Sequence, residues 1–384
     1  MTDVAIIGGG PAGLYAGLTL ARAGHSVTLY EEHADIGEPV HCTGVLARDA
    51  FAQFGLQPDA TLNDLRTVRF FAPSGDVVEY STPHVEAVVI DRARFDHRLA
   101  EQASLAGVVI RRGRVSSLEI DGDGVRVTVG DSPASARVAV LACGANYSLQ
   151  RKLGLGMPRA MLHSAQLELR AERLGDVEVH LGSHVAPRGF GWAVPVLRPD
   201  GPYVRLGLMC TKGAGRYFSR LLADVAPRWG ARADDVPMPR QKVLPLGPIE
   251  RTYADRLLVL GDAAGLVKPT TGGGIYYSLL SAKLAAETLI ENLPHDALDA
   301  ADLSVYESRW RARLGPELRW QLVLRRIAQR LTDSDIDALF ELARTDGIMP
   351  LMRRTASFNE HRGFIMALLK HPPARRVLFR AVLA

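Results

Sequence analysis

The alternation of apolar and polar positions at the start of the chain predicts a strand, a helix and a second strand in close succession. Residues 3–7 are mostly apolar, which is typical of a short strand buried on both faces. Residues 12–23 have the spacing of a helix that stops at Gly24, and residues 25–30 predict the second strand. This order is that of a βαβ unit, from which parallel sheets are built.

The middle of the chain carries a different pattern, that of an antiparallel sheet. Residues 66–80 predict two strands around a turn at residues 73–75, and residues 163–207 alternate as antiparallel strands do. Buried strands of the parallel type are predicted at residues 137–142 and 257–260. We therefore expect a sheet domain inserted into a parallel one.

Helical patterns complete the chain. Residues 91–106 and 274–291 predict helices, and a hairpin is expected around the turn at residues 121–124. Beyond Asp302 the pattern is helical almost to the end. With 384 residues the chain is too long for one ordinary core, and about two or three lobes are expected.

Composition and charge narrow the class of protein. The chain is 47% hydrophobic and 23% charged, with a net charge of +4 and an isoelectric point near 9.0. Basic and aromatic residues do not interleave in the stripe typical of nucleic-acid binding, so no nucleic-acid partner is expected. The mild positive charge is either an ordinary surface balance or an attraction to anionic cofactors and lipid head groups.

Cysteine usage and the lengths of apolar runs bear on the compartment. Cys42, Cys143 and Cys210 form no C-x-x-C pair and no metal-ligand cluster, which suits a reducing compartment and predicts no metal site. Glycines interrupt the apolar N-terminus, unlike a signal peptide, and no apolar run approaches the ~18 residues of a membrane span. We expect a cytoplasmic protein that is either soluble or rests on a membrane surface.

A glycine motif lies between the first strand and the first helix. Residues 8–13 read Gly-Gly-Gly-Pro-Ala-Gly and match the pattern G-x-G-x-x-G. In this pattern Gly8 makes the tight turn, Gly10 lets the backbone approach a pyrophosphate, and Gly13 lets helix and strand pack closely. Because the motif stands between a predicted strand and a predicted helix, it predicts a dinucleotide site.

The helix that starts at Pro11 and Ala12 completes this site. Its first turn has unpaired N–H groups and a partial positive charge, and both favour phosphate. Glu31, followed by Glu32, ends the second strand, where an acidic side chain accepts a hydrogen bond from a ribose hydroxyl. Pro11, Ala12, Glu31 and Glu32 are therefore candidate cofactor-binding residues.

A second glycine segment identifies the dinucleotide. Residues 261–265, Gly-Asp-Ala-Ala-Gly, follow a buried strand and resemble the second FAD fingerprint of the p-hydroxybenzoate-hydroxylase superfamily. The resemblance implies that Asp262 binds the ribityl chain of FAD. Residues 269–274 resemble the loop beside the flavin ring, which implies that the N–H groups of Gly274 and Ile275 stabilise negative charge on the reduced flavin. The flavin-site residues implied in this way also include Gly261, Gly272 and Gly273.

Two further segments resemble the same superfamily. Residues 91–96 are similar to the helix start at which an arginine approaches the FAD pyrophosphate, and Arg92 is either that arginine or a solvated surface side chain. Residues 142–146 are similar to the superfamily's Asp-Gly motif, but Cys143 stands in the place of the aspartate. No role is therefore carried over to Cys143.

Three segments resemble one family within this superfamily, the geranylgeranyl reductases. Residues 38–44 contain the family's P-V-H-C-T-G stretch, and residues 272–277 extend the flavin loop as the family does. Residues 187–195 are similar to its substrate-lining motif P-x-x-Y-x-W-x-F-P, with Phe190 and Val194 in place of tyrosine and phenylalanine. The resemblance implies that the substrate site is lined by Phe190, Trp192 and Tyr276.

The family resemblance also implies the reaction. A reductase of this family saturates carbon–carbon double bonds of an isoprenoid chain of geranylgeranyl type, with hydride from N5 of reduced flavin and a proton for the other carbon. Cys42 is either the proton donor or a small buried apolar residue, and His41 is either a proton relay or a structural histidine. The electron donor is expected to be NAD(P)H, bound transiently because the sequence has no second dinucleotide fingerprint, or a ferredoxin.

The fold class that follows is α/β. A Rossmann-like FAD-binding domain, of the p-hydroxybenzoate-hydroxylase and glutathione-reductase type, carries an inserted and mainly antiparallel substrate domain, and a helical region ends the chain. The expected ranges are 1–60, 85–150 and 251–300 for the FAD-binding domain, 61–84 and 151–250 for the substrate-binding sheet, and 301–384 for the helical region.

Two other functions stay open on the sequence. An FAD-dependent monooxygenase or halogenase that acts on a hydrophobic small molecule uses the same fold, although residues 191–195 lack the second tryptophan of the halogenase motif. A flavin-binding protein without turnover is the other.

The C-terminal residues have two interpretations, and no pattern in the sequence indicates an oligomeric state. The arginines there mark either a solvated helical face or a peripheral contact with an anionic membrane. The residues concerned are Arg353, Arg354, Arg375, Arg376 and Arg380, beside Phe364, Leu368, Leu369 and Leu378.

Overall fold

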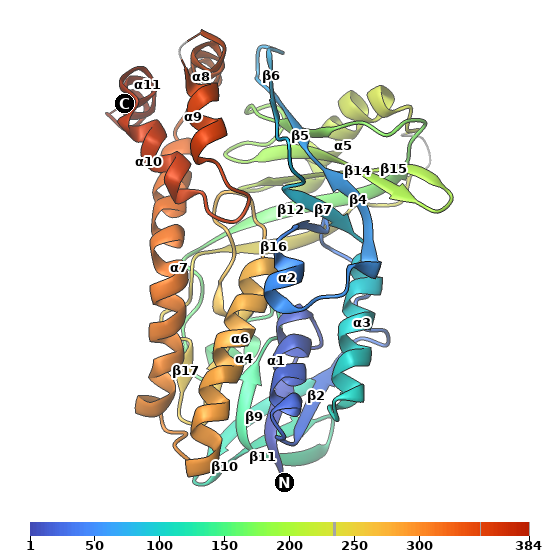
Figure 1. The fold of residues 1–384 in the computed structure, drawn as a ribbon, viewed down its shortest axis with the longest axis vertical. Helices are drawn as coiled ribbons and strands as arrows, with labels where there is room; N and C mark the ends of the chain where they lie inside the picture. Colours follow the sequence, from blue (N-terminus) through green and yellow to red (C-terminus); the bar gives the residue numbers. More distant parts are fainter. Residues whose placement is uncertain (233–235, 346, 384) are drawn as a thin grey trace. The chain divides into compact units, whose positions relative to one another are not determined.

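Three separated stretches of the chain build one unit of the structure, and three others build a second unit. The computed structural model describes residues 1–232, 236–345 and 347–383 (Figure 1). The first unit comprises residues 1–40, 92–160 and 245–318. The second comprises residues 41–91, 161–244 and 319–384.

The first unit contains the parallel sheet that the sequence predicts. Strand β1 (Thr2–Ile7) pairs in parallel with β2 (Val27–Glu31) on one side and with β11 (Ser132–Leu141) on the other. Helix α1 (Pro11–Arg22) connects β1 to β2, so the predicted βαβ unit is confirmed. The main path of the sheet runs β17 (Tyr253–Ala254), β18 (Leu257–Val259), β11, β1, β2, β8 (Val109–Arg112).

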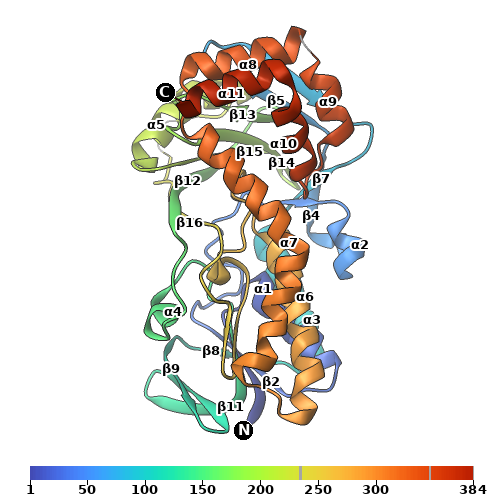
Figure 2. The ribbon, with the colours of Figure 1, turned by 90° about the vertical axis from the view of Figure 1, so that its left-hand side faces the viewer.

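Helices cover this sheet, and the predicted hairpin extends it. Helix α1 packs between α3 (Arg92–Leu105) and α6 (Ile275–Asn292), as Figure 1 shows, and Figure 2 views the same helices from the side on which α6 lies. Strands β9 (Val115–Asp121) and β10 (Gly124–Val129) form the expected hairpin, and β10 pairs with the start of β11. The carboxyl ends of β1, β11 and β18 are left as neighbouring positions on one edge of the sheet.

The second unit is built on a mainly antiparallel sheet. Its strand order is β16 (Arg240–Leu246), β12 (Ala160–Arg170), β15 (Gly201–Cys210), β14 (Phe190–Arg198), β13 (Val177–His180), β5 (Thr67–Phe71), β6 (Val77–Ser81). Strands β12, β15 and β14 form a regular antiparallel ladder, as expected. Helix α5 (Ala214–Val225), which the sequence analysis did not assign, covers one face through Phe218 and Leu221.

The other face of this sheet packs against a small sheet that the sequence did not reveal. Strands β3 (Val45–Ala47), β7 (Ala87–Ile90) and β4 (Thr61–Leu65) form it. Leu65 and Val89 bury their side chains against Val194 and Val196 of β14. Residues 41–60 and 85–91, assigned above to the FAD-binding domain, therefore group with the second unit.

The C-terminal region is helical, as predicted. After α7 (Ala300–Ala328) come α8 (Asp333–Thr345), α9 (Ile348–Thr355), α10 (Arg362–Lys370) and α11 (Pro372–Leu383). Leu368 and Leu378 are buried in the apolar cluster between these helices, and Phe364 and Leu369 pack against it. These four side chains therefore do not form the outward apolar face that a membrane-bound tail requires. Within the described residues, every helix is too short or too polar to cross a bilayer.

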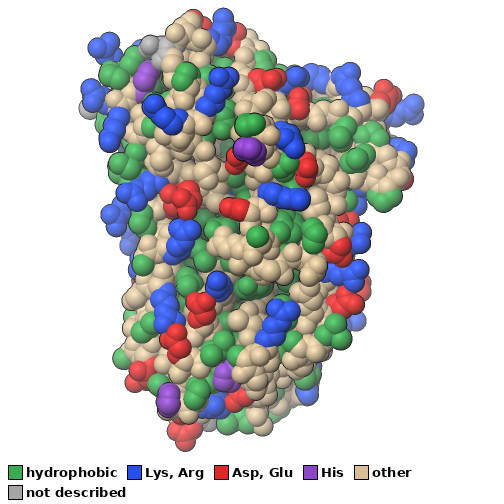
Figure 3. Space-filling view, viewed as in Figure 1, with side chains coloured by type: hydrophobic (Ala, Val, Ile, Leu, Met, Phe, Trp, Pro, Cys, Tyr) green, Lys and Arg blue, Asp and Glu red, His purple; other side chains and the backbone are tan. Residues whose placement is uncertain are grey.

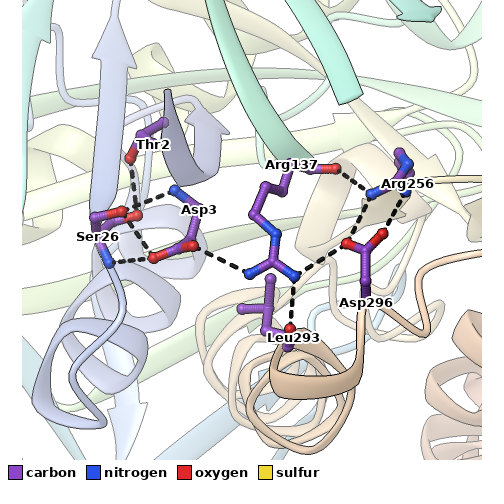
Figure 4. A network of polar contacts seen from close by, with 7 residues as sticks. All are labelled: Thr2, Asp3, Ser26, Arg137, Arg256, Leu293 and Asp296. Atoms are coloured by element: carbon purple, nitrogen blue, oxygen red, sulfur yellow. Dashed lines mark hydrogen bonds and ion pairs between the residues drawn. The ribbon is translucent and has the colours of Figure 1, made fainter. Parts of the chain in front are cut away.

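A network of charged side chains links the strands of the parallel sheet to the segment after α6. It lies at the opposite end of the strands from the glycine loops. Arg137 on β11 donates to the carboxylate of Asp3 at 3.2 Å, to that of Asp296 at 3.0 Å and to the Leu293 carbonyl at 2.6 Å (Figure 4). Arg256, at the turn before β18, donates to the other oxygen of Asp296 at 2.8 Å. Hydrogen bonds from Arg256 and Arg137 lower the pKa of Asp296 to about 2.

We predict that Asp296→Asn weakens this network in a pH-dependent way. The free energy of unfolding should fall by ~1 kcal/mol near neutral pH, a modest effect because the side chain is 49% exposed and water screens the pairs. Because the pKa of Asp296 is about 2 in the folded protein and ordinarily 3.8, its contribution is complete above pH 3.8 and disappears toward pH 2. Urea unfolding at about pH 7 and about pH 3 measures both values. Asp131→Asn, on an exposed turn, is the control. If the difference in the free energy of unfolding between wild type and Asp296→Asn were as large at about pH 3 as at about pH 7, the prediction would be contradicted.

Candidate functional site

The first glycine loop packs too tightly for side chains at two of its positions. Gly8 follows β1 with φ of +111°, and a Cβ there would lie 2.4 Å from the carbonyl oxygen of Ala142, the residue that follows β11. A Cβ at Gly13 would lie 2.0 Å from the Gly8 carbonyl oxygen. Both glycines therefore serve the turn and the close helix–strand contact that the motif predicts.

Gly10 differs because it faces open space. It is the N-cap of α1, its φ is −83°, and no described side chain caps the helix. Apart from its two chain neighbours, no heavy atom of the described residues lies within 4 Å of a Cβ placed on Gly10. Pro11 and Ala12 begin the helix, whose first-turn N–H groups have no intrahelical acceptors. This open helix start is suited to a pyrophosphate.

The two glutamates after β2 have different environments. Glu31 accepts a hydrogen bond from the N–H of Gly9 at 2.6 Å, and its other oxygen accepts one from the N–H of His33 at 2.9 Å. Oε1 also lies 2.6 Å from Nδ1 of His33, so Oε2, which accepts only from Gly9, is the oxygen that keeps a lone pair for a ribose hydroxyl. Glu32 is exposed, with a carboxylate oxygen 3.5 Å from Nε of Arg114. The structure therefore ties Glu31 to the glycine loop, and Glu32 lies at the surface.

The second glycine segment lies against the start of α1. Gly261 has φ of +56°, and a Cβ there would lie 2.8 Å from Oγ of Ser278 on α6 and 3.3 Å from Cβ of Ala12. A Cβ at Gly274, the N-cap of α6, would lie 2.7 Å from Oδ1 of Asp262. The two fingerprints, more than two hundred residues apart in the sequence, thus meet in one place.

The rest of the flavin loop is a tight turn that leads into α6. Gly272, with φ of +73°, donates its N–H to the Lys268 carbonyl at 2.8 Å, and the Lys268 N–H donates to the Gly273 carbonyl at 3.1 Å. Ile275 is the first residue of α6, so its N–H is among those that an α-helix leaves without an internal acceptor. Tyr276 follows in the same turn and is largely buried.

Two residues that the sequence analysis missed support the Asp262 turn. The hydroxyl of Tyr147 donates to the Asp262 carbonyl at 2.7 Å, and the amide of the fully buried Gln150 donates to the Ala263 carbonyl at 3.4 Å. Burial raises the pKa of Tyr147, which keeps its hydroxyl a donor. The sequence signal that could have identified Tyr147 and Gln150 is their position a few residues after the Cys143-Gly144 pair. Burial also raises the pKa of Cys143 to about 11, so this residue presents a neutral thiol where the superfamily has a carboxylate.

Arg92 is not the solvated side chain that one interpretation expected. It starts α3, its side chain is 14% exposed, and its Nη2 donates to Asp96 at 2.7 Å. Asp96 is buried, and desolvation raises its pKa although Arg92 opposes this shift. The pair anchors the guanidinium at the start of the helix.

The expected substrate residues Phe190 and Trp192 share one face of the sheet in the second unit. Their ring centroids are 5.8 Å apart. The indole of Trp192 lies against Gly207, its partner on β15, where a Cβ would be 2.4 Å from a ring atom. The sequence analysis did not single out Gly207 as part of the candidate site, because only strand register shows that it faces Trp192.

The turn that carries Cys42 lies on the same face. Thr43 donates its hydroxyl to Oε1 of Gln166 at 2.6 Å, and Gln166 is the cross-strand partner of Gly207. The N–H of Gly44 points at Sγ of Cys42, 3.3 Å away. Cys42 is half-buried and His41 is exposed. The structure therefore brings the Cys42 turn, Phe190 and Trp192 together within the second unit.

Comparison with known proteins first defines the class. Residues 1–147 match the family model described as an FAD binding domain. A geranylgeranyl bacteriochlorophyll reductase-like protein of Thermoplasma acidophilum has the same fold, with a TM-score of 0.86 at 20% identity over 99% of both chains. A flavin-dependent brominase aligns with a TM-score of 0.68 at 18% identity, over 100% of this chain and 98% of its own. The fold and the FAD loops thus define an FAD-dependent oxidoreductase of the p-hydroxybenzoate-hydroxylase-like class.

Closer relatives then define the family. The chain is 33% identical over 362 residues to digeranylgeranylglycerophospholipid reductase 2 of Methanothermobacter thermautotrophicus, covering 88% of this chain and 90% of the relative. It is 31% identical over 356 residues to digeranylgeranylglycerophospholipid reductase of Methanocaldococcus jannaschii, with the same coverage of each chain. The chain belongs to the geranylgeranyl reductase family.

We predict that Gly207→Ala displaces the indole of Trp192. The added methyl group would overlap the ring, so the free energy of unfolding should fall by ~2 kcal/mol, as overpacking typically costs. Trp192→Ala should remove most of the additional cost of Gly207→Ala, because the ring is then absent. A double-mutant cycle by urea unfolding measures this coupling. Gly215→Ala in α5 is the control, because a Cβ there would meet only the end of the Gln241 side chain, at 3.4 Å. Additive effects at 192 and 207 would contradict the contact.

Proposed function

We propose that this enzyme saturates double bonds of geranylgeranyl-type chains carried on a glycerophospholipid. The observation that carries the proposal is the shared sheet face of Cys42, Phe190 and Trp192, in a chain that also has two FAD loops. Relatives named as digeranylgeranylglycerophospholipid reductases support this substrate class. An isoprenoid chain has almost no polar handles, so an apolar aromatic surface suits its recognition.

The residues of the first unit fit FAD in the following way. The open helix start at Gly10, Pro11 and Ala12 would hold the pyrophosphate, together with Arg92, and Glu31 would accept from the ribose. Asp262 would bind the ribityl chain. The N–H groups at the start of α6 would face the flavin ring edge, where they favour the reduced form. The residues at this edge are Gly272, Gly273, Gly274 and Ile275.

The residues of the second unit would orient the substrate and supply the proton. When bound and reduced, FAD would supply the hydride for one alkene carbon. Phe190 and Trp192 would hold the chain and exclude water. Tyr276, at the start of α6, is a further candidate for contact with the substrate. Cys42 would deliver the proton to the other carbon, and the exposed His41 would return a proton to Cys42 from solvent. The product gains one hydride and one proton for each double bond.

The electron donor and the membrane belong to the same proposal. The donor would be NAD(P)H or a ferredoxin. A lipid substrate favours an enzyme that approaches the cytoplasmic face of a membrane, and exposed arginines on α9 and α11 suit anionic head groups (Figure 3). They are Arg353, Arg354, Arg375 and Arg376; Arg380 is instead paired with Asp335 at 2.6 Å.

A halogenase or monooxygenase is less well supported. The flavin-dependent brominase aligns with a TM-score of 0.68, against 0.86 for the reductase-like protein. Ala193 and Val194 also occupy the positions after Trp192, where the halogenase motif has its second tryptophan. Both observations favour the reductase.

We predict that Gly10→Ala weakens FAD binding without harming the fold. Its φ of −83° is accessible to alanine, and a Cβ would have no described neighbour within 4 Å, so thermal stability of the FAD-free protein should not change. The methyl group would occupy the space proposed for the pyrophosphate and raise the FAD dissociation constant at least about tenfold. Flavin fluorescence titration measures this. Normal FAD affinity in a folded variant would contradict the placement of the pyrophosphate.

We predict that the dithionite-reduced enzyme adds two hydrogens per double bond to digeranylgeranyl phospholipid, detected as a mass gain. Cys42→Ser should bind FAD normally and slow this step roughly a hundredfold, the usual contribution of a general acid. Dithionite removes the unknown donor from the assay, and NADPH and reduced ferredoxin can then be compared.

The same assay separates the competing functions. No mass gain with any isoprenoid tested would overturn the reductase, and halide-dependent product would favour the halogenase. With the substrate in vesicles, a rate that rises with anionic lipid and falls with salt is expected if the exposed arginines contact the membrane.

A further inference from the structure

A buried arginine interrupts the apolar core of the antiparallel sheet in the second unit. Strand β15 is otherwise apolar from Val204 to Cys210, yet it contains Arg205, which is 2% exposed. A guanidinium removed from water costs several kcal/mol unless its donors are paired, so chains rarely keep one without a use. The residues that pair with Arg205 therefore indicate what it does.

Arg205 bridges the sheet and the turn that carries Cys42. Its Nε donates to Oε2 of Glu168 on β12 at 2.6 Å. Its Nη1 donates to the Thr43 carbonyl at 2.6 Å and to the Ile90 carbonyl, at the end of β7, at 3.1 Å. An apolar residue at position 205 would leave both carbonyls without these bonds, and unpaired buried carbonyls are costly.

A second set of bonds holds the same turn from its other side. The Thr43 hydroxyl donates to Gln166 at 2.6 Å, and the Ile90 N–H donates to the Gly44 carbonyl at 2.7 Å. The Gly44 N–H is then directed at Sγ of Cys42. The thiol is thus oriented by a turn whose neighbouring residues are bonded to the sheet.

Strand register places these anchors beside the aromatic residues. Gln166 pairs with Gly207, and Gly207 pairs with Trp192. In the next row Glu168 pairs with Arg205, and Arg205 pairs with Val194. Because residues paired in one row point to the same face of a sheet, the two anchors of the Cys42 turn lie next to the indole of Trp192.

We propose that Arg205 and Gln166 are positioning residues that set the Cys42 thiol against the substrate face of Trp192. The proposal rests on the function inferred above, in which Cys42 supplies the proton. The anchors act on the geometry of the thiol and not on the chemistry directly. Their loss should therefore change the reactivity of Cys42 and the turnover rate more than substrate affinity.

The chain offers a matched control for the loss of an arginine. Arg198 donates to both oxygens of Glu168, at 2.5 and 3.2 Å, and to Asp91 at 2.9 Å. It shares the acidic partner of Arg205, but neither of the bonds from Arg205 to the Thr43 and Ile90 carbonyls. Arg198→Met thus disturbs the charge network and leaves the anchors of the turn in place. Arg170→Met removes an exposed arginine from the same sheet.

The decisive measurement is the alkylation rate of Cys42 by iodoacetamide across pH, read by peptide mass mapping of the FAD-loaded enzyme. We expect Arg205→Met and Gln166→Leu to change this rate at least about fivefold and to lower kcat about tenfold, with KM within about twofold. Arg205→Lys should recover part of the wild-type alkylation rate and part of the wild-type kcat, because an ammonium group can reach one of the acceptors but lacks the guanidinium fork. Arg198→Met and Arg170→Met should leave the Cys42 rate unchanged.

Several outcomes would overturn the proposal. Equal effects of Arg205→Met and Arg198→Met on Cys42 would reduce Arg205 to a structural ion pair, and wild-type reactivity in folded Arg205→Met would remove its role. Should Arg205→Met fail to fold, Thr43→Val tests the Gln166 anchor with almost no change of shape. The alkylation needs no substrate, so it remains informative if lipid reduction fails. Full activity in Cys42→Ser would refute the proton donor and leave the anchoring itself intact.

Discussion

The absence of side chains at a few backbone contacts is the constraint on which the FAD-binding unit depends. Gly13 brings α1 against the Gly8 carbonyl, Gly8 brings β1 against the residue after β11, and Gly261 brings the second loop against Ala12. Any Cβ at these positions would overlap a neighbour, so the three elements could not converge. Because they do converge, an open helix start and the Asp262 turn lie on the same edge of the parallel sheet, where open α/β sheets bind their ligands.

The sheet of the second unit follows a different rule, because the contacts that hold the Cys42 turn are polar and buried. Leucines and valines give the two faces of the sheet their apolar partners, but the Cys42 turn is held by Arg205, Gln166 and the acceptors around them. Buried charges of this kind add little net stability, since desolvation offsets the attraction. What they supply is orientation: a guanidinium with several fixed partners permits one arrangement of the turn.

The small sheet of the second unit was harder to predict from the pattern of apolar and polar residues. The small sheet of β3, β7 and β4 has strands of three to five residues, which carry too little periodicity to separate from loop. Its place is set by the burial of Leu65 and Val89 against β14, a contact between residues far apart in the chain. For the same reason the grouping of residues 41–60 with the second unit depends on tertiary packing, and local preference carries no sign of it.

The βαβ start, the antiparallel ladder, the helical end and both glycine loops could all be predicted from the amino-acid sequence, because each depends on local periodicity or on positions where only glycine fits. The family could be predicted as well, through motifs of fixed spacing. The folded chain was needed to show that Tyr147 and Gln150 support the Asp262 turn, that Trp192 lies on Gly207, and that Arg205 reaches the Cys42 turn. These contacts depend on strand register and on long-range pairing, which no local pattern of residues encodes.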